Sequence, residues 1–220
     1  MPQPTAPLFA FKASGIFGSK RRGRRRLVPL LTTTHRALGA TFIDSHTPDT
    51  NYGADLSLNT GASYLGGAKN GLFRALLPFD LSTLTDRRVL TASLRISVSL
   101  VDVPATFRRL SRLNPPRSWL EFQATWRHRL TGTLWDNAGG NGWNEDPLLY
   151  THPTPLTPGI LNLSGLEALS QDAIDNNGGG LWLNHRGSNE APGAIDRMFY
   201  VSPTASPSAS EPLLTIVSEA

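Results

Sequence analysis

The side chains that most often carry enzymatic chemistry are scattered along this sequence of 220 residues. The absence of cysteine excludes thiolate nucleophiles, disulfides and metal sites built on Cys ligands. The histidines stand at positions 35, 46, 128, 152 and 185, and none is at metal-ligand spacing from another on a helix or on adjacent strand positions. There is no Gly-x-Ser-x-Gly elbow, phosphate-binding loop or dinucleotide fingerprint. The sequence therefore predicts a protein that is not an enzyme.

Oxygen-bearing side chains gather between residues 136 and 146. Asp136, Asn141, Glu145 and Asp146 can supply the oxygen ligands that calcium prefers, but their spacing is not that of a known calcium loop. A turn cluster rich in Asn and Gly is the simpler interpretation. We expect no cofactor, with calcium at these four residues as the alternative.

Tryptophans are the second group of candidate binding residues, because an exposed indole face can stack on a sugar ring. Trp135 and Trp143 lie in a stretch rich in Gly and Asn that has the composition of a loop. Trp182 stands between two leucines that face the opposite way, so it can belong to the core or to the surface. These three are the candidate carbohydrate-binding residues, whereas we expect Trp119 and Trp126 to fill the core.

The basic charge is concentrated at the N-terminus. Residues 1–40 carry eight basic side chains and no acidic one, while the rest of the chain carries 13 basic and 17 acidic side chains, a net charge of −4. The segment shows neither helical nor strand periodicity, so it is either a solvated tail or an arm that docks on a partner. The candidate docking residues are the apolar anchors Phe9, Phe11, Ile16 and Phe17 and the arginines Arg21, Arg22, Arg24, Arg25 and Arg26.

Neither export nor membrane insertion is expected for this arm. The apolar stretch that follows Arg26 is short and is broken by Pro29 and three threonines, unlike the core of a signal peptide. No run approaches the roughly 18 apolar residues of a membrane-spanning helix.

The remaining sequence is typical of an all-β domain. The 20 Gly and 17 Pro of the whole chain resist continuous helix, and short apolar segments recur between turn formers after residue 40. We predict a two-sheet β-sandwich or jelly roll over residues 41–220, preceded by the arm at 1–40. The predicted strands are 40–43, 56–59, 72–79, 92–100, 107–113, 160–163, 180–184, 198–201 and 213–217.

One helix is predicted between Ser164 and Asn177. Ser164 and Glu167 have the spacing of a capping box, and an Asn-Asn-Gly sequence ends the pattern. The apolar side of this helix is formed by Leu166, Leu169, Ala173 and Ile174.

An ordered set of short motifs resembles the DNRLRE domain, a disaggregatase-related group of carbohydrate-binding modules. The resemblance covers about residues 40–218. Its motifs are Asn51-Tyr52-Gly53, the segments 74–82 and 91–96, Trp119-Leu120-Glu121 with Ala124-Thr125-Trp126, then Trp135, and finally 199–202 and 211–216. The resemblance implies a non-catalytic β jelly roll, often attached to extracellular or cell-wall proteins and in some members binding acidic polysaccharide.

Two of these motifs also have a physical interpretation. We expect the Asp80 carboxylate to accept backbone N–H bonds in the turn after a strand that ends with Phe79. We expect Asn51 and Gly53 to occupy a turn that needs a positive φ.

Three functions follow from these features, in this order. The first is a structural protein of a virus particle, most simply a bacteriophage, that decorates the capsid or tail and docks through its arm on other virion proteins and on copies of itself. The second is a secreted or cell-surface module that binds acidic polysaccharide. The third, nucleic-acid binding through the arginine run, ranks last because the body is net acidic and shows no recognised nucleic-acid fold.

Overall fold

The structure is a computed structural model that describes residues 28–64, 70–101, 108–112, 119–140, 150–151, 157–187, 198–202 and 210–219. Several candidate residues lie outside these ranges: the anchors and arginines of the arm, and Asn141, Trp143, Glu145 and Asp146.

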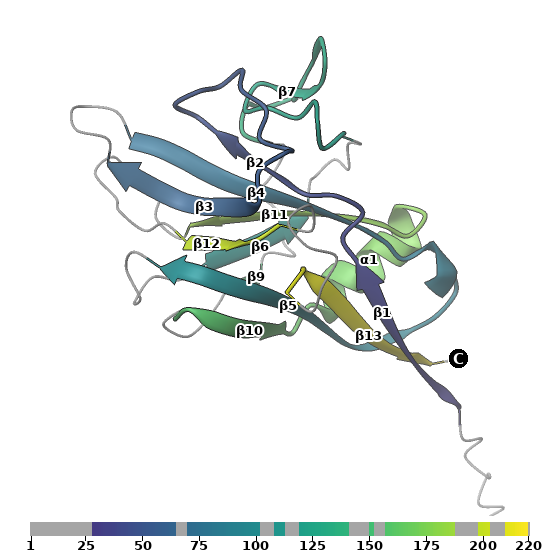
Figure 1. Cartoon of the computed structure of the whole chain (residues 1–220). Helices are drawn as coiled ribbons and strands as arrows, with labels where there is room; N and C mark the ends of the chain where they lie inside the picture. The colour runs from purple at the N-terminus through teal and green to yellow at the C-terminus, as the bar shows by residue number, and fades with distance from the viewer. Residues whose placement is uncertain are drawn as a thin grey trace, which may run out of the picture.

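Eleven strands of the described chain form one antiparallel sheet that curls into two facing layers (Figure 1). The hydrogen-bonded order is β1-β13-β5-β12-β3-β4-β11-β6-β9, with β10 paired to β5 and β2 paired to β4. The predicted all-β two-sheet sandwich is confirmed. The strands are β1 (Leu30–Arg36), β2 (Thr41–Asp44), β3 (Ser57–Tyr64), β4 (Asn70–Asp80), β5 (Val89–Val101), β6 (Arg108–Arg112), β9 (Tyr150–Thr151), β10 (Gly159–Ser164), β11 (Gly180–Gly187), β12 (Met198–Val201) and β13 (Leu213–Glu219), and β7 (His128–Leu130) pairs with β8 (Thr133–Leu134) in a small second sheet.

Strand β3 joins the two layers. Its residues Ser57 to Thr60 pair with β12, and its residues from Gly61 onward pair with β4 in the other layer. Gly61 stands at this change of partner with a φ of 103°, a conformation that a residue with a Cβ atom rarely adopts.

The main core lies between the layers and follows the expected alternation of side chains. Ala75, Leu77 and Phe79 of β4 face it, as do Leu181 and Leu183 of β11. The alternate residues of β4 and β11 face outward, and a second apolar cluster covers that outer face. It consists of Ile43, Leu76, Trp119, Ala124 and Trp135, with Trp126 and Trp182 packed against it.

The alternation predicted for β5 changes near its end. Leu94, Ile96 and Val98 are buried as expected, but Leu100 is exposed and Val101 is buried in its place. The pairing of β12 with β5 shifts register at this point, and a shift of one residue moves the following side chains to the other face.

The single α-helix of the described chain, α1 (Glu167–Asn176), buries the predicted apolar side but lacks the predicted cap. Ser164 ends strand β10 opposite Ser93, so its backbone belongs to the sheet. The Glu167 carboxylate accepts a hydrogen bond from the backbone N–H of Ala92, at 3.2 Å. The capping-box prediction was therefore wrong, because both residues are engaged by β5.

The predicted boundary of the arm at residue 40 also needs correction. Strand β1 lies within the expected arm, yet it pairs with β13 along its whole length, from Leu30 opposite Glu219 to Arg36 opposite Leu213. This strand, together with the short β7, β8 and β9, was absent from the predicted set. Within the described residues, the sheet therefore begins at residue 30.

Candidate binding groove on the outer sheet face

The groove is built on a segment that the sequence motifs bring together. The side-chain amide of Asn51 donates hydrogen bonds to the backbone carbonyls of Glu121 and Ala124, at 2.8 and 2.7 Å. Its side-chain oxygen accepts the backbone N–H of Gly53 at 3.0 Å. The Asn51-Tyr52-Gly53 turn therefore holds residues 121–124 against the outer face of the sheet.

Gly53 is required here for a different reason from the one predicted. Its φ is not among the positive values found in the chain. Instead, a Cβ atom at residue 53 would lie closer than 3.0 Å to the backbone carbonyl of Glu121. The turn needs glycine because two backbone segments approach each other closely.

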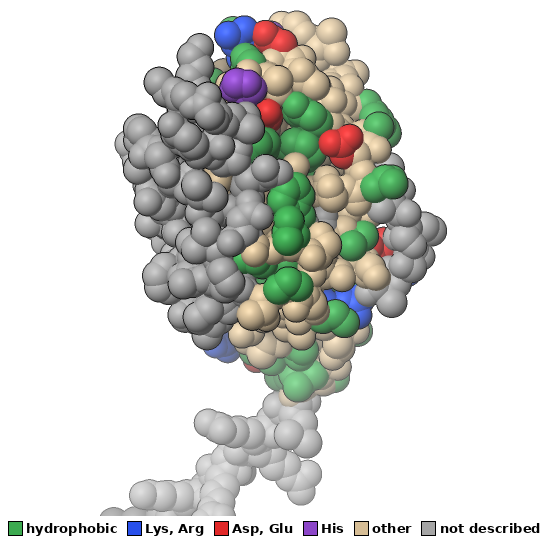
Figure 2. Space-filling view, turned by 60° about the vertical axis from the view of Figure 1, so that its left-hand side comes forward, with side chains coloured by type: hydrophobic (Ala, Val, Ile, Leu, Met, Phe, Trp, Pro, Cys, Tyr) green, Lys and Arg blue, Asp and Glu red, His purple; other side chains and the backbone are tan. Residues whose placement is uncertain are grey.

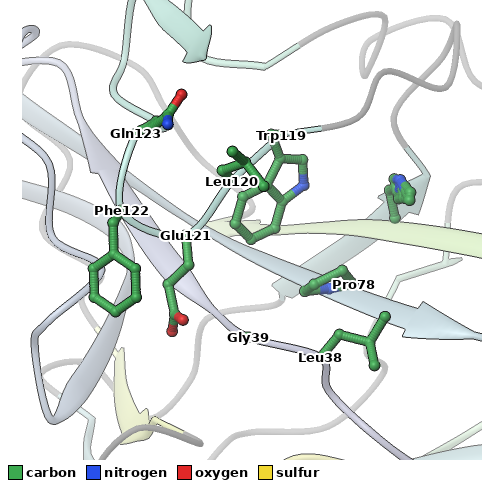
Figure 3. Close-up of a pocket in the computed structure, with 9 residues that line it drawn as sticks. Leu38, Gly39, Pro78, Trp119, Leu120, Glu121, Phe122 and Gln123 are labelled. Carbon is green, nitrogen blue, oxygen red and sulfur yellow. The ribbon is translucent and has the colours of Figure 1, made fainter. Parts of the chain in front are cut away.

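The Glu121 side chain fixes the same segment from the other side. Its carboxylate accepts a hydrogen bond from the backbone N–H of Ala40 at 3.0 Å and lies against Gly39. Figure 3 shows this carboxylate directed toward Gly39. Residues 119–124 are thus tied both to the 51–53 turn and to the loop between β1 and β2.

An apolar groove of about 450 Å³ lies where this segment meets the sheet (Figure 3). Three of its apolar side chains are largely exposed: Leu38 at 71%, Leu120 at 53% and Phe122 at 64%. We call this site the outer groove, and it is lined by Leu38, Gly39, Pro78, Trp119, Leu120, Glu121, Phe122, Gln123 and Trp182. An opening of this size lies in the range of ligand-binding sites.

The floor of the outer groove contains a buried donor. The indole N–H of Trp119 has no hydrogen-bond acceptor among the described residues, although the side chain is only 8% exposed. A buried indole N–H usually has a hydrogen-bond partner, but this one is covered by neighbouring atoms and does not reach the surface of the groove.

Of the three predicted carbohydrate-binding tryptophans, one is buried, one lines the outer groove and one lies outside the described residues. Trp135 is only 4% exposed, and its indole N–H donates to the Thr125 carbonyl at 2.9 Å. Because its faces are covered by the second cluster, the prediction that it stacks on a sugar was wrong. Trp182 is half-buried and lines the outer groove, whereas Trp143 lies outside the described residues.

The two tryptophans expected in the core behave differently from each other. Trp119 is buried, as predicted. Trp126 is half-buried and packs against the guanidinium of Arg74, whose carbon lies 4.7 Å from the ring centroid. Arg74 is itself buried and donates to the Gly139 carbonyl, which holds the end of the 119–140 segment on the sheet.

The described residues do not test the calcium alternative, because they include only one of its four predicted ligands. They contain no group of three or more His, Asp or Glu side chains that could hold a metal ion. Asp136 is exposed, and Asn141, Glu145 and Asp146 lie outside the described ranges.

The expected role of Asp80 is confirmed. Its carboxylate accepts the backbone N–H of Ser82 at 2.8 Å, directly after β4 ends. Hydrogen bonds from the Ser82 side chain and backbone lower the pKa of Asp80 below its usual 3.8. This contact fixes the turn beyond the strand that carries Pro78 of the outer groove.

No protein-family model matches the chain, and no curated protein matches it. The resemblance to DNRLRE domains therefore rests on the motifs themselves. Within the described residues, no helix has the length and apolar character needed to cross a membrane.

Proposed function

We propose that this chain is a non-catalytic structural protein of a virus particle, a jelly-roll module that decorates the capsid or tail and docks through its basic arm. The observation that carries the proposal is the separation of charge between a wholly basic arm and a net acidic body. A basic arm of this kind is attracted to the acidic surface of a neighbouring body, which speeds and orients docking.

The strand that follows the arm supports the same proposal. Within the described residues, β1 pairs only with β13, so its other edge lies open. Its side chains alternate between exposed and half-buried, and Leu30 is 64% exposed. An open edge strand next to a docking arm offers a second, main-chain route to a neighbouring subunit.

Exposed apolar surface elsewhere is consistent with a protein that works in an assembly. Figure 2 shows hydrophobic side chains running as a band down one face of the molecule. Patches of this kind often mark interaction sites.

The test is to compare the full chain with a variant that lacks residues 1–26 in purified particles. We expect the full chain to be found in the particles, by imaging and by mass spectrometry, and the deletion variant to be folded but absent. Normal incorporation of the deletion variant would overturn the proposal. Circular dichroism of the purified variant provides the control for folding.

A second candidate function is favoured by the outer groove. Trp182 and Phe122 provide aromatic faces beside the polar side chains of Glu121 and Gln123, a combination that suits a sugar. This is the secreted or cell-surface carbohydrate-binding module implied by the resemblance. Its test is binding of the full chain to an acidic polysaccharide such as alginate and to a neutral one, with Trp182→Ala as the matched variant.

A further inference from the structure

We propose that the outer groove receives the apolar anchors of the arm from a second copy of this chain. This inference deepens the proposed function, because it names the partner on which the arm docks. The occupant is the segment containing Phe9, Phe11, Ile16 and Phe17, and the receptor is the surface around Leu38, Pro78, Leu120 and Phe122.

The first argument is the match between apolar surfaces. Leu38, Leu120 and Phe122 expose more than half of their surface beside a groove of about 450 Å³. Burying such side chains against an aromatic anchor removes apolar area from water on both partners, with about 25 cal/mol gained per Å².

The second argument concerns why the arm would reach another copy rather than its own groove. The glycine most suited to turn the arm back along β1 is Gly23, which has Lys20–Arg22 on one side and Arg24–Arg26 on the other. A hairpin there would place like charges directly opposite each other, which is destabilising. The same repulsion favours an extended run of charges. Phe17 precedes Val28 by eleven residues, so an extended chain carries it up to about 36 Å away from the body.

The third argument is the charge next to the groove. Pro78 and Asp80 alternate to the same face of β4, so the Asp80 carboxylate lies about 7 Å along the strand from the groove. Helix α1 carries Glu167, Asp172 and Asp175 and no basic residue. It leads through Gly179 to β11, whose first residue Gly180 pairs with Asp80 at this end of β4. Basic residues near this end include His35 and Arg36 of β1, and Arg87, whose backbone carbonyl accepts a hydrogen bond from Gln171 of α1. An anchored arm would bring its arginines past these carboxylates.

The test uses the absence of cysteine from the chain, which makes every introduced thiol unique. A full-length chain with Ser19→Cys is mixed with one carrying Gln123→Cys, so that the four anchors and Phe122 stay in place, and the mixture is oxidised mildly. We expect a covalent pair of the two different chains, formed at least several-fold faster than in the control mixture. The control replaces Gln123→Cys by Ile160→Cys on β10, a residue that is 67% exposed and is not part of the groove.

A second measurement keeps the inference falsifiable if the thiols do not react. Sedimentation of the full chain should give at least twice the chain mass of 23.9 kDa, and Phe122→Ser should return it to a monomer while Ile160→Ser should not. Mixing the Phe122→Ser chain with a chain whose four anchors are Ser should partly restore association, because each supplies the part that the other lacks.

Each other outcome overturns the inference. A double variant, Ser19→Cys with Gln123→Cys, that closes within one chain at high dilution would assign the groove to the chain's own arm. A monomer without preferred crosslinking whose groove binds alginate or a neutral glycan would assign it to a sugar. The proposed function is tested separately, since incorporation into particles without crosslinking refutes only the inference, and crosslinking without incorporation refutes only the proposed function.

Discussion

Gly53 and Glu121 pack so closely that a Cβ atom on residue 53 would overlap the backbone carbonyl of residue 121. Gly53→Ala should therefore lower the free energy of unfolding by about 1–3 kcal/mol, because backbone cannot move aside as a flexible side chain can. Chemical denaturation measures the change. The control is Gly71→Ala, where the added Cβ would be at least 3.4 Å from its neighbours. Equal losses in the two variants would contradict the close approach.

Asn51 makes the hydrogen bonds that hold the same segment, so its replacement tests the polar side of this contact. Asn51→Asp keeps the shape and the acceptor for Gly53 but removes the donors to the Glu121 and Ala124 carbonyls. We expect a loss of about 1–3 kcal/mol at neutral pH for the carbonyls left unpaired, with added repulsion from the new charge. Melting temperatures of the parent and of Asn51→Asp, measured under the same conditions, report this loss. An unchanged melting temperature would refute the role of Asn51.

Sequence patterns predicted more of the fold than of the outer groove. Strands such as β5 and β13 were predictable because each alternates apolar and polar side chains over one buried face. Strand β1 was not, since this edge strand only half-buries its inner face and its threonines give no clear alternation of polarity. The helix cap failed for a related reason: spacing does not show that Glu167 is already hydrogen-bonded to β5.

The outer groove was beyond sequence analysis because four separate segments build it. Leu38 comes from the loop after β1, Pro78 from β4, Phe122 from the 119–124 segment and Trp182 from β11. Trp182 was recognised as a candidate, but the sequence gives no reason to prefer it over Trp135. Only the packing of the 119–140 segment onto the outer sheet face shows that one is covered and the other lies at its margin.

The two tryptophans should therefore differ in stability and in binding. Trp135→Ala removes a buried aromatic side chain and should lower the free energy of unfolding by about 3–5 kcal/mol, as measured by urea denaturation. Trp182→Ala removes a half-buried one and should cost less than half as much. Similar losses from both would mean that Trp182 is core and not part of a binding surface.

The lowered pKa of Asp80 predicts that the stability of the fold depends on pH in the acid range. The pKa of its carboxyl is lower in the folded chain than the usual 3.8, so the ionised group stabilises the fold above that pH and the contribution disappears as pH falls through the folded pKa. Asp80→Asn should thus be less stable than the parent at neutral pH, with the difference shrinking as the pH falls below the usual pKa of 3.8. Melting temperatures across this range measure it, with exposed Asp55→Asn as the control. A difference that stays constant on acidification would contradict the assignment.

The last prediction separates the two chemical components of the arm. Exposed ion pairs contribute little affinity each but raise the rate of encounter, whereas apolar contacts govern how slowly a complex dissociates. Replacing Phe9, Phe11, Ile16 and Phe17 by Ser should release the protein from its partner even at low salt. Replacing the five arginines by Gln should leave slower attachment whose rate no longer falls with ionic strength, because the screened term has been removed. Surface plasmon resonance on immobilised particles, or on immobilised full-length chain, measures both rates. Loss of attachment in the arginine variant alone would instead make charge, and not the anchors, the basis of retention.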